Sequence, residues 1–209
     1  AANWLGNRIT AEAKHIGAVN CLYRGKENHL YGTNTDGEAS VLSYRSNFGD
    51  MTANSILILG TGGVAKAVSA YFAAEVGETG KITMVVRSEN GKEYAKSINA
   101  DWINWSEVYR IIKDVDGVIN CTSIGFLDQE NESPLTMNQI NLISSDANIF
   151  DVIYQPVVTK FLSLSKERGL NNINGSEMNI DQAVLAFNYV NPSFQDLTEI
   201  KKVMLKAAS

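Results

Sequence analysis

A glycine-rich segment that follows a short apolar run offers the clearest chemistry in the sequence. Ser55–Leu59 is apolar after its first residue, and Gly60, Gly62 and Ala65 follow it in a G-x-G-x-x-A pattern. Gly60 permits a tight turn out of a buried strand, Gly62 lets the backbone approach a pyrophosphate, and Ala65 lets the next helix pack closely. The helix N-terminus would add free N–H groups and a positive dipole end. The pattern predicts a phosphate-binding loop made of Gly60, Thr61, Gly62, Gly63 and Val64, and its structural alternative is an ordinary strand–helix turn.

The end of the next apolar run indicates which dinucleotide this loop would bind. A strand predicted over residues 81–86 ends at Val86, and Arg87, Ser88 and Lys92 follow it. NAD sites usually carry an acidic residue at the end of this strand, where it binds the ribose 2′-hydroxyl. Here Glu89 comes too late for that role, whereas the planar guanidinium of Arg87 suits a 2′-phosphate. We therefore predict NADP as the cofactor, and the alternative is that Arg87 is a solvated loop residue.

Strands and helices alternate through the middle of the chain, so the glycine loop would lie at the carboxyl ends of the strands of a parallel sheet. Short apolar runs predict buried strands, and segments with helical periodicity separate them. This alternation predicts an α/β fold with a doubly wound parallel (Rossmann) sheet that is covered on both faces. The predicted strands are 55–60, 81–86, 115–120 and 147–153, and the predicted helices are 64–76, 92–98, 106–113, 136–142 and 159–168.

The two ends of the chain differ in character from this middle part. A polar connector at 47–54 is the best candidate for a domain boundary. We predict a nucleotide-binding domain over residues 50–174 and a discontinuous second domain made of residues 1–49 and 175–209. Its predicted elements are helices at 10–15, 36–46, 176–190 and 194–206, strands at 16–23 and 30–33, and a turn at 25–28.

Composition and charge narrow the class of protein. The 209 residues are 44% hydrophobic and 20% charged, which is typical of a soluble globular protein with its own core. A net charge of −5 argues against a nucleic-acid partner, and no apolar run approaches the ~18 residues of a membrane span. The start of the sequence lacks the features of a signal peptide. With only Cys21, Cys121 and two histidines, we expect no metal site, reduced thiols and a cytoplasmic location.

Four polar residues outside the glycine loop could contact a substrate, although each has an ordinary structural explanation. Asn20, at a strand end, could simply satisfy a turn. Asp36 lies in a turn-forming segment and could cap the helix that follows. Gln182 could belong to the polar face of a helix, and Tyr154 could be a core aromatic with a hydrogen-bonded hydroxyl. The residues alone leave these explanations open.

Six ordered motifs together resemble the shikimate dehydrogenase family. The resemblance runs from about residue 10 to residue 190, and the combination of motifs is far more specific than any one of them. The motifs are Gly17–Asn20, Gly32–Gly37, Gly60–Ala67, Asn120–Gly125, Asp151–Pro156 with Thr159, and Asn174–Met178 with Gln182 and Ala183.

The resemblance implies a reaction and a role for each matching residue. The implied reaction is reversible hydride transfer between NADP and shikimate, which gives 3-dehydroshikimate in the biosynthesis of chorismate and aromatic amino acids. Asp36 resembles the catalytic aspartate at the reacting hydroxyl. The implied substrate contacts are Asn20, Asp36, Tyr154 and Gln182. The implied cofactor contacts are Gly60–Val64 at the pyrophosphate, Val86, Arg87, Ser88 and Lys92 at the 2′-phosphate, and Thr122, Val152, Gly175 and Met178 beside the nicotinamide.

The chain also departs from the family pattern. The family commonly has Asn where this chain has Val86, and its second basic residue comes one position before Lys92. Before the first motif, the family has a Ser-x-Ser for the substrate carboxylate and a V-T-x-P-x-K whose lysine is the catalytic partner of the aspartate and the main proton acceptor. Neither occurs in these 209 residues, and Lys14 matches no motif lysine. The predicted second domain, which would bind substrate, is therefore incomplete.

Three interpretations of the whole protein follow. The first is a fragment of an NADP-dependent dehydrogenase that acts on a small hydroxy acid. The second is a non-catalytic NADP-binding module that lacks the family's lysine. The third is a related enzyme with a shifted substrate such as quinate, and the absence of an acid at Val86 counts against an NAD-using form of it. The first is favoured because Asn20, Asp36, Tyr154 and Gln182 would serve no purpose in a nucleotide binder. A homodimer is left open.

Overall fold

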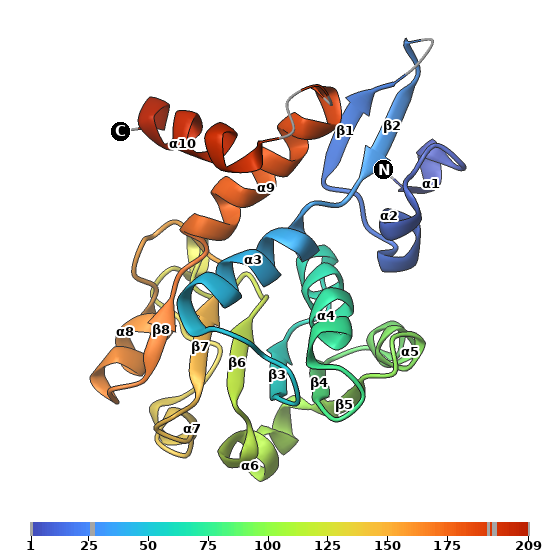
Figure 1. Ribbon diagram of the computed structural model, residues 1–209. Coiled ribbons are helices and arrows are strands. Elements are labelled where there is room, and N and C mark those ends of the chain that lie inside the picture. The colour runs from blue at the N-terminus through green and yellow to red at the C-terminus, as the bar shows by residue number, and fades with distance from the viewer. Residues whose placement is uncertain (1, 26–27, 192, 194–195, 209) are drawn as a thin grey trace.

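A single sheet of six parallel strands organises the computed structural model, which describes residues 2–25, 28–191, 193 and 196–208 (Figure 1). The strand order is β5-β4-β3-β6-β7-β8. The order reverses between β3 and β6, and a ligand crevice lies at this kind of switch point in doubly wound sheets. The predicted α/β Rossmann class is confirmed. The strands are β3 (Ser55–Leu59), β4 (Lys81–Val86), β5 (Asp101–Asn104), β6 (Gly117–Asn120), β7 (Asn148–Asp151) and β8 (Asn171–Ile173).

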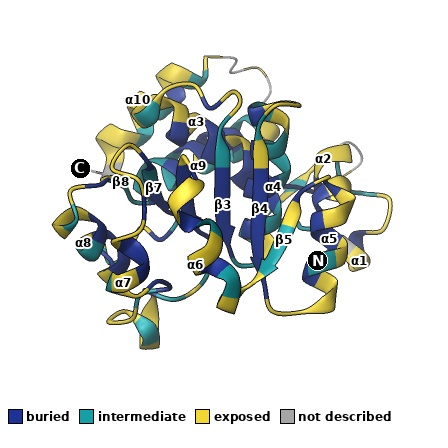
Figure 2. Cartoon of the chain, turned by 90° about the horizontal axis from the view of Figure 1, so that it is seen from below, coloured by how far each residue is buried: buried dark blue, intermediate teal, exposed yellow. Residues whose placement is uncertain are grey.

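Two hydrophobic clusters, one on each face of the sheet, hold the helices in place. In β3, the side chains of Ile56 and Ile58 join one cluster, and those of Leu57 and Leu59 join the other. Figure 2 shows β3 and β4 as the buried centre of the molecule. The first cluster includes α3 (Asp36–Phe48), α4 (Gly63–Val76), α5 (Glu89–Ser97) and α9 (Ser176–Val190), and the second includes α6 (Val108–Ile111), α7 (Met137–Ile140) and α8 (Lys160–Glu167).

Residues 2–25 and 28–33 lie beside this layered unit. Helices α1 (Ala2–Leu5) and α2 (Ala11–Ile16) precede an antiparallel pair of strands, β1 (Cys21–Arg24) and β2 (Leu30–Thr33). Thr33 pairs with Cys21, so the end of β2 lies next to the start of β1. Figure 1 shows this hairpin rising next to the C-terminal end of α9, where the rings of Tyr23 and Tyr189 are 5.2 Å apart.

A charged cluster ties the last helix, α10 (Leu197–Ala208), to α9. The Lys201 ammonium lies 2.7 Å from the carboxylate of Asp181 and 3.0 Å from that of Glu177. Glu177 also accepts a hydrogen bond of 2.8 Å from Asn47, which lies on α3. Three helices therefore meet at one group of charges. Because α9 also carries Gln182, this cluster helps to hold one wall of the site described below.

Most predicted elements are present, but α1 was not predicted and several bounds differ. The helix predicted at 106–113 is the four-residue α6 between two 3-10 turns. The strand predicted from Ile16 begins only at Cys21, because α2 runs through Ile16 and ends at Gly17, whose φ is +71°. Strands β5 and β8 were not predicted, because both are short edge strands without a continuous apolar run. Part of the predicted turn at 25–28 and the start of the helix predicted from 194 lie outside the described residues. The division into domains stays a prediction.

Replacing Phe72 by Ala should destabilise the fold strongly. The Phe72 side chain is fully buried in α4, and its ring meets Tyr44 edge-on at 5.3 Å. Removing a buried aromatic ring costs about 3–5 kcal/mol of unfolding free energy, because the cavity left behind closes only in part. Urea unfolding measures the change. The control is Leu42→Ala on the exposed side of α3, and an equal loss in both variants would contradict this packing.

Candidate active site

The glycine loop lies where β3 ends and α4 begins, at the switch point of the sheet. Gly60 has a φ of +108°, and a Cβ at this position would lie 3.1 Å from the Cys121 carbonyl oxygen. The loop therefore passes too close to the end of β6 for a larger residue. Gly62 is the N-cap of α4, and nothing lies within 4 Å of the place where its Cβ would be. The first N–H groups of a helix lack partners within the helix, so this open surface suits a phosphate group.

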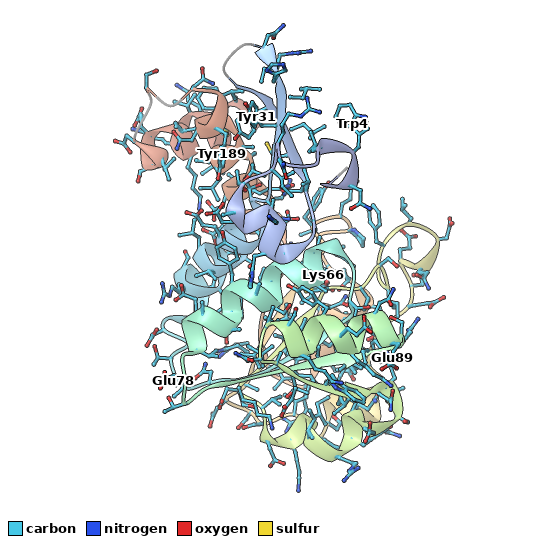
Figure 3. All side chains as sticks on the ribbon, turned by 90° about the vertical axis from the view of Figure 1, so that its right-hand side faces the viewer. Trp4, Tyr31, Lys66, Glu78, Glu89 and Tyr189 are labelled. Carbon is cyan, nitrogen blue, oxygen red and sulfur yellow. The ribbon has the colours of Figure 1, made fainter. Side chains whose placement is uncertain are left out.

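The residues predicted to recognise a 2′-phosphate lie at the carboxyl end of β4. Figure 3 shows Lys66 and Glu89 at one end of α4 and α5, and Glu78 at the opposite end. At this end, Ser88 caps α5 by accepting a hydrogen bond from the Gly91 N–H. The Val86 side chain is buried in the core, so only its backbone can face a ligand. Arg87 lies over the Trp105 ring, and Lys92 lies over the Trp102 ring.

The close approach of α5 to the glycine loop explains the late position of the second basic residue. A Cβ at Gly91 would lie 2.9 Å from the Thr61 side chain and 3.3 Å from Cβ of Val86. A side chain at Gly91 would therefore require the Thr61 side chain to shift. Lys92, one residue later, has room for its long side chain and pairs with Glu89 at 3.0 Å.

Three polar side chains from distant parts of the sequence meet beside the glycine loop. The Asn20 amide nitrogen donates to Asp36 Oδ1 at 2.7 Å and to Gln182 Oε1 at 3.1 Å. Its oxygen accepts the backbone N–H of Thr35 at 2.9 Å. The N-cap of α3 is Thr35, so the alternative that Asp36 caps this helix is wrong. Burial raises the pKa of Asp36, while the hydrogen bond from Asn20 lowers it in part.

A pocket of about 110 Å³ joins this polar cluster to the residues predicted to contact the nicotinamide. Tyr154 is one of the residues that line the pocket. Its side chain is 48% exposed, so it is not a core aromatic. A second pocket of about 150 Å³ shares Val152 and Tyr154 with the first and contains Thr122. A third hollow, of about 810 Å³, lies at the far end of α4 and contains none of the predicted site residues. The lining of the first pocket is Asp36, Val64, Val152, Tyr154, Gly175, Met178, Asn179 and Gln182.

A buried network that the sequence did not predict holds the walls of both pockets. Asp151 is fully buried at the end of β7 and accepts hydrogen bonds from Thr159, Asn120 and the Ile153 N–H. The Asn120 oxygen in turn accepts from the N–H and the hydroxyl of Thr122. Asp151 therefore fixes both Thr122 and the segment that carries Val152 and Tyr154. The signal in the sequence was one polar residue at the end of each of two adjacent apolar strands.

Gly175 closes this part of the site by a backbone contact. A Cβ at Gly175 would lie 2.0 Å from the Val152 carbonyl oxygen, a distance that no side chain tolerates. The Gly175 N–H also donates to the Ile153 carbonyl at 3.0 Å. The start of α9 is thereby held against the β7 loop, which brings Met178 and Gln182 to the pocket.

Two other features, a membrane-spanning helix and a metal site, were sought in the described part of the chain. None of its helices has the length and the apolar character needed to cross a membrane. Within the same residues, no three or more His, Cys, Asp or Glu side chains lie where they could share a metal ion.

A glycine loop at the switch point of a doubly wound sheet places the chain among the dinucleotide-binding α/β proteins. A shikimate dehydrogenase (NADP(+)) of Alkaliphilus metalliredigens (strain QYMF) is 32% identical over 209 residues, which cover 95% of this chain and 71% of that protein. The chain belongs to the shikimate dehydrogenase family.

Further comparisons agree with this assignment. A shikimate dehydrogenase (NADP(+)) of Microcystis aeruginosa (strain NIES-843 / IAM M-2473) is 32% identical over 191 residues, covering 86% of this chain. The crystal structure of a shikimate dehydrogenase in complex with NADP+ is 25% identical and has a TM-score of 0.80, covering 96% of this chain and 70% of that one. The chain spans 65% and 71% of the length of the two curated relatives. No family model matches it.

Acidification should stabilise the network around Asp151. Desolvation by burial raises the pKa of this carboxyl to about 6, although the hydrogen bonds from Thr159, Ile153 and Asn120 lower it. A carboxyl whose pKa is higher in the folded state destabilises the fold once it is ionised, and this cost disappears as the pH falls. Between pH 7 and pH 4, wild type should gain ~2 kcal/mol of unfolding free energy relative to Asp151→Asn.

Urea unfolding of both proteins at the two pH values measures this gain. Asp146→Asn, which changes an exposed carboxyl in the turn before β7, controls for the substitution itself. An unchanged difference between wild type and Asp151→Asn would show that Asp151 is not desolvated as described.

Proposed function

We propose that this protein is an NADP-dependent oxidoreductase that interconverts shikimate and 3-dehydroshikimate by hydride transfer. The observation that carries the proposal is the single pocket that joins Asp36 and Gln182 to Val64, Val152, Gly175 and Met178. A substrate hydroxyl held by the first pair would face a cofactor ring held by the other four. Family membership supports the same activity, since the curated relatives are named shikimate dehydrogenase (NADP(+)).

The residues at the carboxyl ends of the strands fit an NADP molecule. The open backbone surface at Gly62, next to the unpaired N–H groups of α4, would hold the pyrophosphate. The cations of Arg87 and Lys92 and the hydroxyl of Ser88 would hold the 2′-phosphate. The nicotinamide ring of bound NADP exchanges a hydride with the substrate, and the protein supplies orientation and proton handling.

The polar cluster would orient the substrate for this exchange. Asp36 would accept the hydrogen bond of the reacting hydroxyl at the oxygen that Asn20 now contacts. Asn20 and Gln182 would then bind neighbouring hydroxyl groups, since their amides can both donate and accept. Tyr154, which is half exposed beside the pocket, would cover the substrate from the β7 side.

The proposal extends to the organisation of the chain. Residues 50–174 would bind the cofactor, while residues 1–49 and 175–209 would contribute to substrate binding. Asn20, Asp36 and Gln182 all come from the second set of residues, which supports this division. A cytoplasmic location and a homodimeric assembly belong to the same proposal, and sedimentation of the native protein measures its assembly.

Absorbance of NADPH at 340 nm tests the proposed activity in the protein purified from its source. We expect NADPH to form when shikimate and NADP+ are added, with far less product from NAD+ or from quinate. Binding of NADP+ without turnover of shikimate would overturn the proposed enzymatic activity and support a non-catalytic NADP-binding module. Faster turnover of quinate than of shikimate would support the related enzyme with a shifted substrate.

Asp36→Asn should remove most of the activity and leave cofactor binding as in wild type. The substitution keeps the shape of the side chain but removes its charge, and positioned acid–base groups typically contribute about 10²–10⁴-fold in rate. The kcat for shikimate oxidation and the Kd for NADP+ are the two measurements. Asp50→Asn, just beyond the other end of α3, is the control and should retain activity. Full activity in Asp36→Asn would remove Asp36 from the mechanism.

Arg87→Glu should weaken NADP+ binding far more than NAD+ binding. The substitution removes a charge-assisted contact to the 2′-phosphate and adds repulsion. We therefore expect NADP+ to bind about 10-fold to 100-fold more weakly, while the affinity for NAD+ stays nearly unchanged. Isothermal titration with both cofactors measures this difference. Arg110→Glu reverses the charge of an exposed arginine on α6 and serves as the control. Equal losses for NADP+ and NAD+ would contradict the assignment of Arg87.

A further inference from the structure

Two tryptophans outside the glycine loop each lie against one of the two cations assigned to the 2′-phosphate. The Arg87 guanidinium carbon is 5.0 Å from the ring centroid of Trp105. The Lys92 ammonium is 4.6 Å from the ring centroid of Trp102. Both separations fall within the range of a cation–π interaction. Both tryptophans come from β5 and the turn after it, a part of the chain that no family motif described above includes.

The register of the sheet explains the pairing of Arg87 with Trp105. Strands β4 and β5 are parallel, and Val86 pairs with Asn104. The next residue on each strand is therefore Arg87 and Trp105, side by side at the carboxyl edge. Glu107 accepts hydrogen bonds from the backbone N–H and the side-chain amide of Asn104, which orders the turn that Trp105 begins. Trp105 also packs against the second hydrophobic cluster, the one that includes α6, α7 and α8.

Lys92 reaches its tryptophan from the neighbouring helix. It lies in α5, and Trp102 lies opposite Met84 in β5, where it packs against the other core cluster. A Cβ at Gly91 would crowd the side chains of Thr61 and Val86. The second cation comes from the next residue, Lys92, whose ammonium lies over the Trp102 ring.

An indole holds a cation differently from a carboxylate. A carboxylate partner neutralises the cation and competes with an incoming phosphate, whereas an indole carries no net charge and leaves the cation free to bind an anion. Among the described residues, no carboxylate pairs with Arg87. The only acidic partner of Lys92 among them is Glu89, whose side chain is 69% exposed. Both cations are thus restrained before a ligand arrives, which lowers the entropy lost on binding.

We propose that Trp105 and Trp102 are positioning residues for recognition of the 2′-phosphate of NADP. Trp105 holds Arg87 and Trp102 holds Lys92, so the preference for NADP over NAD depends on β5 and the turn after it. The inference rests on the proposed function, because it assigns supporting residues to the same cofactor site. Neither tryptophan touches the reacting atoms, and their substitution should act on the 2′-phosphate alone.

The test compares two adenine nucleotides that differ by this phosphate. Adenosine 2′,5′-bisphosphate and 5′-AMP are titrated calorimetrically into the native protein and into Trp105→Leu. We expect Trp105→Leu to bind the bisphosphate roughly twofold to tenfold more weakly, because the released Arg87 side chain must then lose its conformational freedom when the phosphate binds. Binding of 5′-AMP should not change. Trp102→Leu should act in the same direction.

A matched control comes from the third tryptophan. The Trp4 ring also carries a cation, with the Arg8 guanidinium 5.7 Å from its centroid. It belongs to α1, and Figure 3 shows it on a different part of the molecule from Glu89 at the start of α5. Trp4→Leu should therefore leave the affinity for both nucleotides unchanged. Trp105→Phe keeps an aromatic face in a smaller ring, so its affinity for the bisphosphate should lie between those of wild type and Trp105→Leu. This variant keeps the test valid if Trp105→Leu folds poorly.

A double-mutant cycle separates positioning of Arg87 from a general loosening of the fold. In an Arg87→Met background, Trp105→Leu should have no further effect on the ratio of bisphosphate to 5′-AMP affinity, because the cation is already gone. A further drop of similar size in that background would overturn the inference. An equal loss of bisphosphate and 5′-AMP binding in Trp105→Leu would also overturn it.

The remaining outcomes distinguish the inference from the proposed function. If wild type prefers the bisphosphate and Trp105→Leu behaves like Trp4→Leu, the role of the tryptophans is wrong and the NADP site stands. If wild type binds both nucleotides equally, the 2′-phosphate site itself is wrong, and the inference fails with it.

Discussion

The side-chain amide of Asn20 is the interaction on which the rest of the site depends. It contacts Asp36 at 2.7 Å and both Thr35 and Gln182 at 3.1 Å, although an amide nitrogen has only two hydrogens to donate. The shortest contact is the one to the carboxylate, as expected for a charge-assisted hydrogen bond. The start of β1, the start of α3 and the middle of α9 must therefore stay together for the site to exist. The hairpin and the charged cluster at Lys201 maintain this arrangement.

The other half of the site depends on close backbone approaches. A Cβ would meet the Cys121 carbonyl at Gly60, the Thr61 side chain at Gly91 and the Val152 carbonyl at Gly175, so a larger residue at any of these positions would displace its neighbour. Polar groups complete the arrangement where the strands end, because Asp151 and Asn120 connect β6, β7 and the loops that follow them. A buried carboxyl with a raised pKa is an energetic cost, and here it orients residues on both sides of the pocket.

The sequence predicted the parts of this structure whose pattern is local. The apolar runs that became β3 and β4 and the glycine loop between β3 and α4 follow from residue types alone, because buried parallel strands are continuously apolar. Strands β5 and β8 have no such run, since an edge strand is stabilised by pairing with a neighbour on one side. Missing β5 also meant that Trp105 could not be placed beside Arg87. The meeting of Asn20 with Gln182 spans 162 residues, so only the family resemblance and then the fold could bring them together.

We propose that the Asn20–Asp36–Gln182 cluster and the glycine loop form one site for substrate and cofactor. A crystal structure of the native protein with NADP+ and shikimate bound tests it most directly. We expect a shikimate hydroxyl within hydrogen-bond distance of Asp36 and Asn20, and the nicotinamide ring among Val64, Val152, Gly175 and Met178. Shikimate bound away from Asp36, or a nicotinamide ring outside this pocket, would contradict it.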